Sequence, residues 1–426
     1  MVAMFSLFIV RYLLKISVPP AIFLGVAMIP IFRGTTNEQL AFVASCIPFS
    51  VAFQYKYAIL ILTVVILWRN NWRLKRAGLF VVVMFMMFWE LCHAFYGHFS
   101  YVEYLRDFAE LILLGVVTSI SLDDIDYKLI IRSLAISVVG VCLIMLIMQL
   151  QKHNFNLITV FARSAHSFRF GQSNMGSGAF ALNFNANNLG FICNLSACGC
   201  LLLISRKDYQ RTDMILAIFS FVFAMLTLSR AAIVCSVMIF VSFLLSAEGK
   251  SVNRIFRSIT GIAITTVVVV LLWVFIPAVF ENLLERFQRA DVWNGRGALL
   301  KYYGQFMVSS VKYFMFGIGM QEIYKKVVPY FPVHDVPHMG LQEVWVAWGI
   351  VGVITILFVF WKIILISKHY AKGKRQIYQF VPLVLIIIYT SSGQLLTSSR
   401  ALMALIIAFI CLSVGKNKDT EKSSAP

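Results

Sequence analysis

Two arginines and one histidine are the side chains of this sequence best suited to chemistry on an anionic group. Arg230 stands between two apolar runs, Arg296 lies in Asn294-Gly295-Arg296-Gly297, and His338 directly precedes another apolar run. A guanidinium donates paired hydrogen bonds to phosphate or carboxylate. An imidazole can remove a proton from a hydroxyl or donate one to a phosphate near neutral pH. These residue types therefore predict an anion-binding site with an acid or base beside it.

Each of these residues also has an interpretation without chemistry. Arg230 can extend toward the membrane surface or pair with an acidic group, Arg296 can contact lipid headgroups, and His338 can cap the helix that follows it. Arg400, which follows Ser399 between the last two apolar runs, is in the same situation as Arg230. Gln342 lies one helical turn beyond His338 and is a candidate for contact with the same ligand.

The segment from 150 to 188 contributes a second group of polar residues. It contains Arg169 and ends in Asn185, Asn187 and Asn188, at the start of an apolar run. Asparagines at this position commonly cap a helix. Their amides equally suit sugar hydroxyls, so Arg169 and Asn187 are candidate substrate-binding residues and both interpretations stay open.

The composition places these residues in a membrane protein. Hydrophobic residues make up 60% of the 426 residues and charged residues only 13%, and the mean hydropathy is +0.82. Several apolar runs reach the roughly 20 residues that a helix needs to cross a bilayer, and they are continuous rather than alternating. We expect one all-α membrane domain over 1–426, built from twelve transmembrane helices: 12–32, 47–68, 77–97, 101–121, 129–149, 189–204, 213–228, 231–247, 258–280, 341–366, 377–394 and 400–415.

Charge orients these predicted spans. Lys and Arg are dense in short connections, which the positive-inside rule assigns to the cytoplasm: around 69–76, 206–211, 250–257, 368–375 and the tail 416–426. With twelve spans all five clusters fall on one side, so both termini are expected inside. The long segments 150–188 and 281–340 then face outward together, as do Arg230 and Arg400.

Several other classes are disfavoured. The net charge of +18 lies mostly in these short connections, where it orients a membrane protein and gives no reason to expect nucleic acid. The eight cysteines all fall in or beside apolar runs, so neither a disulfide framework nor a zinc pattern is indicated. Acidic residues are scarce outside, which disfavours a metal held by carboxylates. The first thirty residues are expected to be a retained anchor rather than a cleaved signal peptide.

Acidic residues inside the predicted spans form one cluster. Glu103, Arg106, Asp107 and Glu110 recur on one helical face, and Glu90 on the neighbouring span could join them. Charges at membrane depth are functional candidates. Arg106 can pair with its acidic neighbours, and we expect a structural ion-pair cluster.

The long segment 281–340 has its own predicted order. An amphipathic helix should begin at Arg296 and end at the turn Phe316-Gly317-Ile318-Gly319, because glycine tolerates the left-handed conformation that ends a helix. Beyond His338, Gly349 and Gly352 would allow close helix packing.

Taken in order, these motifs resemble the O-antigen polymerases and O-antigen ligases of bacterial surface polysaccharide assembly. The resemblance covers mainly 166–353 and rests on 178–189, Leu228-Ser229-Arg230-Ala231, Gly295-Arg296, the 316–319 turn and His338 with its glycines. It implies a GT-C-like fold with a large periplasmic loop before the tenth helix. It further implies an inner-membrane glycosyltransferase, free of metal and cofactor, that uses an undecaprenyl-diphosphate-linked oligosaccharide at the periplasmic face.

The resemblance assigns roles to individual residues. His338, Arg230 and Arg296 stand at its catalytic positions. The ligase pattern has Asn, Ser or Gln after the histidine, whereas this chain has Met339, which favours a polymerase of O-antigen or capsule, with membrane lipid and a chain-length regulator protein as partners. The alternatives are an O-antigen ligase acting on lipid A-core, a protein oligosaccharyltransferase, and a lipid-linked glycan flippase. A flippase should show two comparable halves and short loops, which this sequence lacks.

Overall fold

The computed structural model describes fourteen segments of the chain, all of them helices, their connections and one small β-hairpin. The described residues are 33–48, 55–69, 78–95, 100–119, 126–152, 154–155, 174–175, 182–183, 186–205, 210–227, 229–246, 296–323, 337 together with 339–370, and 380–392. The predicted spans 12–32, 258–280 and 400–415 lie outside them, as do Arg169, His338 and Arg400.

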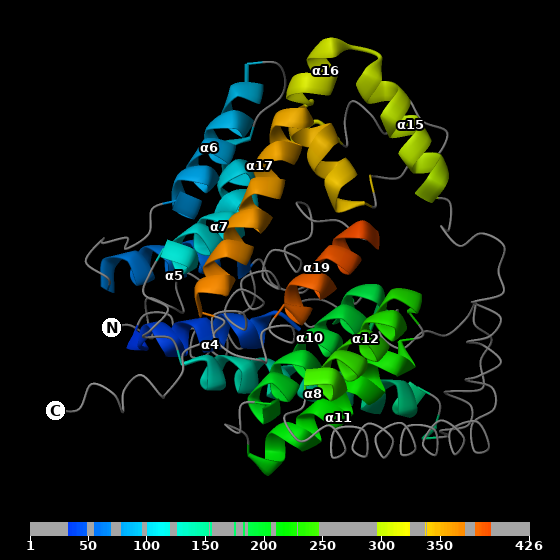
Figure 1. Cartoon of the computed structure of the whole chain (residues 1–426). Helices are drawn as coiled ribbons and strands as arrows, with labels where there is room; N and C mark the ends of the chain where they lie inside the picture. Colours follow the sequence, from blue (N-terminus) through cyan, green and yellow to red (C-terminus); the bar gives the residue numbers. More distant parts are fainter. Residues whose placement is uncertain are drawn as a thin grey trace.

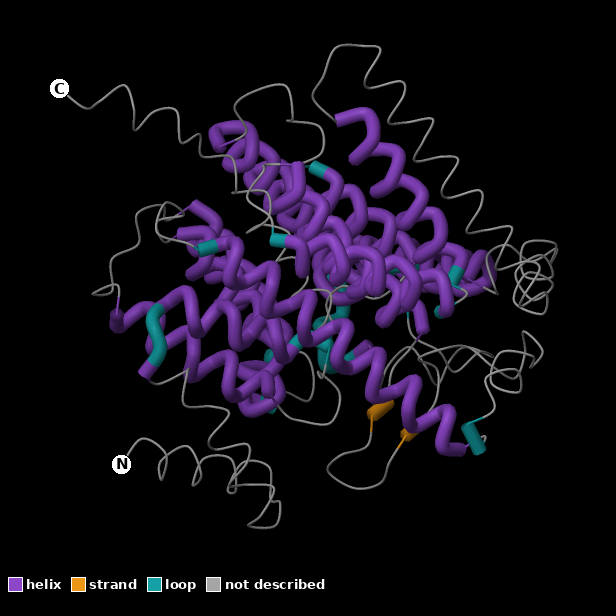
Figure 2. Tube along the Cα trace, turned by 90° about the horizontal axis from the view of Figure 1, so that it is seen from below, coloured by secondary structure: helices purple, strands orange, loops and turns teal. Residues whose placement is uncertain are grey.

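Helices account for nearly all of this described chain, which confirms the all-α prediction. They are α4 (Thr36–Cys46), α5 (Tyr55–Arg69), α6 (Gly78–His93), α7 (Tyr101–Ser119), α8 (Tyr127–Lys152), α10 (Ala186–Ser205), α11 (Arg211–Leu226), α12 (Arg230–Ser246), α15 (Arg296–Val308), α16 (Val311–Phe316), α17 (Gly340–Tyr370) and α19 (Val381–Ser392). The strands β1 (Asn174–Met175) and β2 (Leu182–Asn183) pair antiparallel, and Figure 2 shows them together at the periphery.

The helices form two groups (Figure 1). In one group α10 packs against α8, α11, α12 and α19, and α4 lies along α8. In the other, α7 packs between α5 and α6, while α17 contacts α6, α15 and α16. Contacts of α4 with α5 and of α17 with α19 join the groups.

Among the described residues, three helical stretches are long and apolar enough to cross a membrane: Tyr127–Gln151, Ala186–Ser205 and Gly340–Leu365. The span from Ala186 is buried on nearly every side, which makes α10 the centre of its group. Such an all-round apolar helix is typical of the middle of a helical bundle. Length and composition therefore support a membrane protein.

Small side chains and an ion pair between described residues hold the α10 group together. A Cβ on Gly199 of α10 would lie 2.9 Å from the Ile131 side chain of α8, and the Cys142 and Cys193 sulfurs of the same helix pair are 3.8 Å apart. Close approach at small residues is how membrane helices gain packing energy. These two pairs run in opposite order along the chain, so α8 and α10 are antiparallel.

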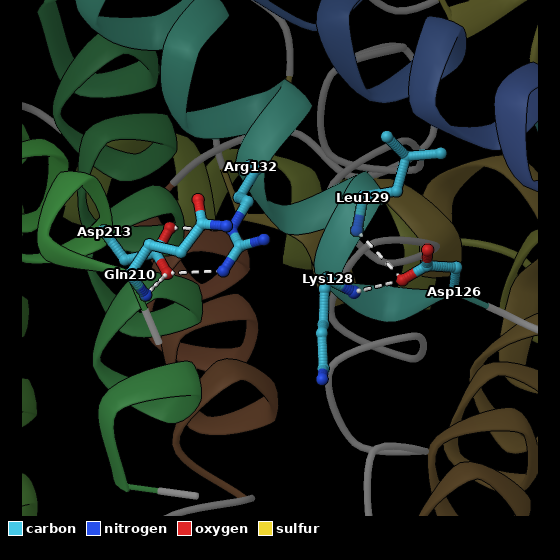
Figure 3. Close-up of polar contacts among 6 residues, drawn as sticks. All are labelled: Asp126, Lys128, Leu129, Arg132, Gln210 and Asp213. Carbon is cyan, nitrogen blue, oxygen red and sulfur yellow. Dashed lines mark hydrogen bonds and ion pairs between the residues drawn. The ribbon is translucent and has the colours of Figure 1, made fainter. Parts of the chain in front are cut away.

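The ion pair joins α8 to α11 (Figure 3). Arg132 Nε and Nη2 each donate to one oxygen of the fully buried Asp213 carboxylate, both at 2.9 Å. The Gln210 backbone N–H also donates to this carboxylate, at 2.7 Å. Bidentate pairing fixes the guanidinium plane as well as the distance, so the starts of α8 and α11 are held side by side.

The first predicted connection is placed differently from the sequence expectation. Twelve spans put residues 33–46 on the opposite side of the membrane from Arg69 and Asp126. In the structure Arg69 Nη2 donates to the Arg33 carbonyl at 2.9 Å, and Asp126 N donates to the Asn37 side chain at 2.7 Å. The predicted placement is therefore wrong: the start of α4 shares one end of the fold with the end of α5. At about 1.5 Å per residue, α4 is too short to cross a bilayer.

The predicted tenth span is broken rather than continuous. Gly349 has φ 66° and ψ −164°, which divides α17 into a short helix over 340–348 and a longer helix over 350–370. Figure 1 shows the two parts diverging from this point. At about 1.5 Å rise per residue only the second part is long enough to span a bilayer. The glycine was expected to allow close packing, and it also turns the chain.

Candidate functional site

Arg230 is the first residue of α12 and is half-buried at the turn from α11. Ser229 precedes it, and the Ser229 hydroxyl accepts a hydrogen bond from Ala232 N at 3.4 Å, as an N-cap residue does. The buried Thr227 hydroxyl donates to the Ala224 carbonyl at 2.7 Å. Both hydroxyls are therefore engaged in local hydrogen bonds, one at the end of α11 and one at the start of α12.

The start of α10 lies directly beside this turn. A Cβ on Gly190 would stand 2.5 Å from the Ala232 Cβ and 2.8 Å from the Thr227 hydroxyl. Further along, Asn194 Nδ2 donates to the Ala232 carbonyl at 2.7 Å. Asn187, at the start of α10, and Arg230, at the start of α12, therefore belong to one end of the helix group.

The last turns of α19 complete this end. The Tyr389 hydroxyl donates to Asn188 Oδ1, and its ring stacks on Phe191 with centroids 4.1 Å apart. Asn188 was expected either to cap α10 or to bind sugar. In the structure the oxygen of its side-chain amide accepts a hydrogen bond from Tyr389 of α19. Arg400 follows α19 in the chain but lies outside the described residues.

Gln342 joins the helix that begins at Arg296 to the short helix of α17. Its Nε2 donates to the Leu300 carbonyl of α15 at 3.2 Å, with Leu299 O at 3.4 Å. Arg296 is the first residue of α15, one turn before these carbonyls. The structure thus brings Gln342 and the helix of Arg296 together, while the Arg296 side chain lies outside the described residues.

The carbonyl oxygen of Gln342 stands out among the buried polar atoms. Gln342 is only 5% exposed, and no residue of the described chain donates a hydrogen bond to its Oε1. Leaving a buried acceptor unpaired costs about 1–3 kcal/mol. A ligand hydroxyl or amide at this position would remove that cost.

The predicted amphipathic helix is present in two pieces, α15 and α16. Leu299, Tyr303 and Met307 form its buried face, and Phe306 stacks on Tyr313 across the break with centroids 5.0 Å apart. The helix ends at Phe316 and Gly317 follows with φ 76°, as the glycine turn predicted.

Glu90 has a role that sequence reasoning did not find. The carboxylate is 2% exposed and accepts hydrogen bonds from Met320 N, at 3.0 Å to Oε1, and from Trp348 Nε1, at 2.7 Å to Oε2. The prediction grouped Glu90 with the charges of α7, where Glu110 is fully buried. A lone carboxylate in an apolar helix was the available signal, but its partners lie more than 200 residues away.

Among the described residues no group of three or more His, Cys, Asp or Glu side chains is arranged to hold a metal ion. Comparison of the sequence with models of known protein families, and with individual characterised proteins, gives no match.

Proposed function

We propose that this protein is a polysaccharide polymerase of the bacterial inner membrane. It joins undecaprenyl-diphosphate-linked oligosaccharide repeat units at the periplasmic face, within a polytopic helical fold of the GT-C-like type. The support is the resemblance carried by Arg230, Arg296 and His338, together with the long apolar helices.

The unpaired Gln342 oxygen is the observation that carries the proposal furthest. It is a buried acceptor located one turn beyond His338 in sequence and bonded through its amide to the helix that begins at Arg296. The oxygen is enclosed by packed helices, so a glycan hydroxyl would satisfy it once the neighbouring side chains move aside to admit the sugar. Gln342 thus follows His338 in sequence and is bonded to the helix that begins at Arg296.

In the proposed reaction the acceptor hydroxyl oxygen attacks the anomeric carbon of the donor sugar. His338 takes the hydroxyl proton as general base. The bond from the anomeric carbon to the diphosphate oxygen breaks, and its electron pair leaves with the lipid diphosphate. Arg230 and Arg296 stabilise that negative charge with fixed guanidinium groups, so no divalent ion is required. Attack from the opposite face inverts the anomeric configuration.

Asn187, Arg169, Gln342 and Arg400 bind the substrate in this proposal. Asn187 starts α10 beside the turn that holds Arg230. A site that spans both helix groups would hold the lipid diphosphate and the acceptor glycan together.

Purified full-length protein in lipid nanodiscs, supplied with a defined lipid-linked repeat unit, tests the proposal. His338→Ala should lower the rate of chain growth about 10²–10⁴-fold, the usual contribution of a general base. Arg296→Lys, which keeps the charge and loses the bidentate geometry, should also be impaired. Arg211→Ala is the matched control, because Arg211 is exposed at the start of α11, the opposite end of that helix from the Arg230 turn.

Long chains made by both His338→Ala and Arg230→Ala, inserted at normal levels, would refute the assignment. Addition of lipid A-core to the same assay separates the alternatives. Transfer to that acceptor in place of a second repeat unit identifies a ligase. Movement of the lipid-linked glycan across the membrane without a new glycosidic bond identifies a flippase.

A further inference from the structure

Two glycines cross at the point where α17 breaks. A Cβ on Gly317 would lie 2.4 Å from the Ala347 carbonyl oxygen, and a Cβ on Gly349 would lie 2.2 Å from the Met315 carbonyl oxygen. Both glycines have positive φ, 76° and 66°. The turn after α16 and the break in α17 therefore pack backbone against backbone, which side chains larger than hydrogen would prevent.

Backbone hydrogen bonds connect the turn after α16 to the end of the short helix 340–348. Ile318 N donates to the Val346 carbonyl at 3.0 Å, and Gly319 N donates to the Ala347 carbonyl at 2.7 Å. The last carbonyls of a helix have no partners within it. The glycine turn supplies donors to the end of the short helix 340–348, so the direction of that helix depends on the turn.

Two side chains of α6, Glu90 and His93, bond to the residues around the glycine turn and the break in α17. The Glu90 carboxylate accepts from Met320 N, just after the turn, and from Trp348 Nε1, just before the break. His93 Nε2 lies 2.9 Å from the Phe316 carbonyl oxygen, and its Nδ1 lies 2.9 Å from the Trp89 carbonyl oxygen. Carbonyl oxygens only accept, so a neutral ring donates to one of these two carbonyls at a time.

We propose that Glu90 is a positioning residue for the site described above. Its carboxylate fixes the short helix 340–348 against the glycine turn, and this sets the place of Gln342. The inference rests on the proposed function for its consequence in catalysis. It also assigns a site role to α6, which lies outside the part of the chain that carries the family resemblance.

The geometry predicts which substitutions weaken the contact between the glycine turn after α16 and the break in α17. Glu90→Gln removes the charge and puts an amide N–H₂ where an acceptor was. Trp348→Phe removes one donor and keeps a ring that can stack on Phe108, whose centroid is 6.0 Å from that of Trp348. Glu38→Gln is the matched control, because Glu38 is exposed at a helix start where glutamine fills the same capping role.

Thiol labelling in the full-length protein measures the position of the short helix without any substrate. With the native cysteines replaced, Met339→Cys reports on the start of that helix, and Ser309→Cys reports on the exposed turn after α15. Glu90→Gln should change the labelling rate at position 339 by about tenfold or more, since it weakens hydrogen bonds to a charged group. Labelling at position 309 should stay within about twofold, and Glu38→Gln should change neither rate.

Trp348→Phe should shift the rate at position 339 in the same direction. The double variant should show less than the product of the two single effects, because both remove one interaction. Turnover in the polymerase assay should fall with the change at position 339, while KM for the lipid-linked unit changes less.

An unchanged rate at position 339 in both Glu90→Gln and Trp348→Phe overturns the positioning role, whatever the activity. A changed rate in a protein that forms no glycosidic bond even before substitution supports the positioning role and refutes the proposed function. Should Glu90→Gln fail to fold, the Trp348→Phe labelling result decides alone.

Discussion

Gly349→Ala is the substitution whose effect the structure specifies most closely. The residue has φ 66° and ψ −164°, a region that is essentially restricted to glycine. The added methyl group would lie 2.2 Å from the Met315 carbonyl oxygen and 2.3 Å from the Met315 carbonyl carbon. These are backbone atoms, so the clash cannot be relieved by a rotation of a side chain.

Two costs add to give the magnitude. Holding alanine in that backbone conformation costs about 1–3 kcal/mol. Inserting a methyl group into close-packed surroundings costs about 1–3 kcal/mol more. Gly349→Ala should therefore lower the free energy of unfolding by about 2–6 kcal/mol, with the sum taken from these two ranges. Loss of this size unfolds many proteins of ordinary stability.

Denaturant unfolding of detergent-solubilised protein, followed by far-UV circular dichroism, measures the effect. Gly304→Ala is the matched control, because Gly304 lies inside α15 and a Cβ there would meet nothing within 4 Å. The same substitution at that position should raise stability by about 0.5–1 kcal/mol, since alanine is the better helix former. The two variants are thus expected to change stability in opposite directions.

A Gly349→Ala protein as stable as its Gly304→Ala counterpart would refute the reasoning. That result would mean that α17 runs straight through position 349 as one helix, where alanine is favourable. The crossing with the glycine turn, and the positioning role of Glu90, would then be lost together.

Four further experiments test other parts of the structure. Gln149→Leu should raise the free energy of unfolding by about 1–3 kcal/mol, because Gln149 Oε1 is buried and no residue of the described helices donates to it. Gln321→Leu should lower it in the same denaturation assay, because that amide exchanges two hydrogen bonds with the Ser100 backbone, at 2.8 and 3.1 Å. Asp213→Asn should cost about 1.5–3 kcal/mol by the same measurement, since it removes the charge from a bidentate pair. Cysteines placed singly at Arg33 and Arg69 should react with an impermeant thiol reagent from the same side of the membrane, and labelling from opposite sides would restore the original twelve-span placement.

Local sequence was sufficient where the physical cause is local. The apolar runs predicted the positions of α8, α10, α11 and α12 to within a few residues, because a helix satisfies its own backbone wherever a run is long enough. The glycine turn after Phe316 was predicted for the same reason, since positive φ is a property of the residue itself. The side of the membrane assigned to 33–46 was wrong, because counting spans assumes that every apolar run crosses.

The candidate site also has features that local sequence predicted and features that it did not. Arg230 and Asn187 were expected on one surface from the parity of the spans, and the structure places the starts of α12 and α10 side by side. Which polar groups are already paired could not be predicted, since Asn188 finds Tyr389 more than 200 positions away.

By itself, the sequence determined that the described chain is almost entirely helical and where α8, α10, α11 and α12 lie to within a few residues, and it selected the arginines and the histidine to be tested. Only the tertiary structure decided that α17 breaks at Gly349, that Glu90 bonds to both sides of the break, and that no described residue donates to the side-chain oxygen of Gln342. Helix formation depends on neighbours three or four residues apart. The break, the buried carboxylate and the unpaired oxygen depend instead on helices that meet only when the whole chain packs.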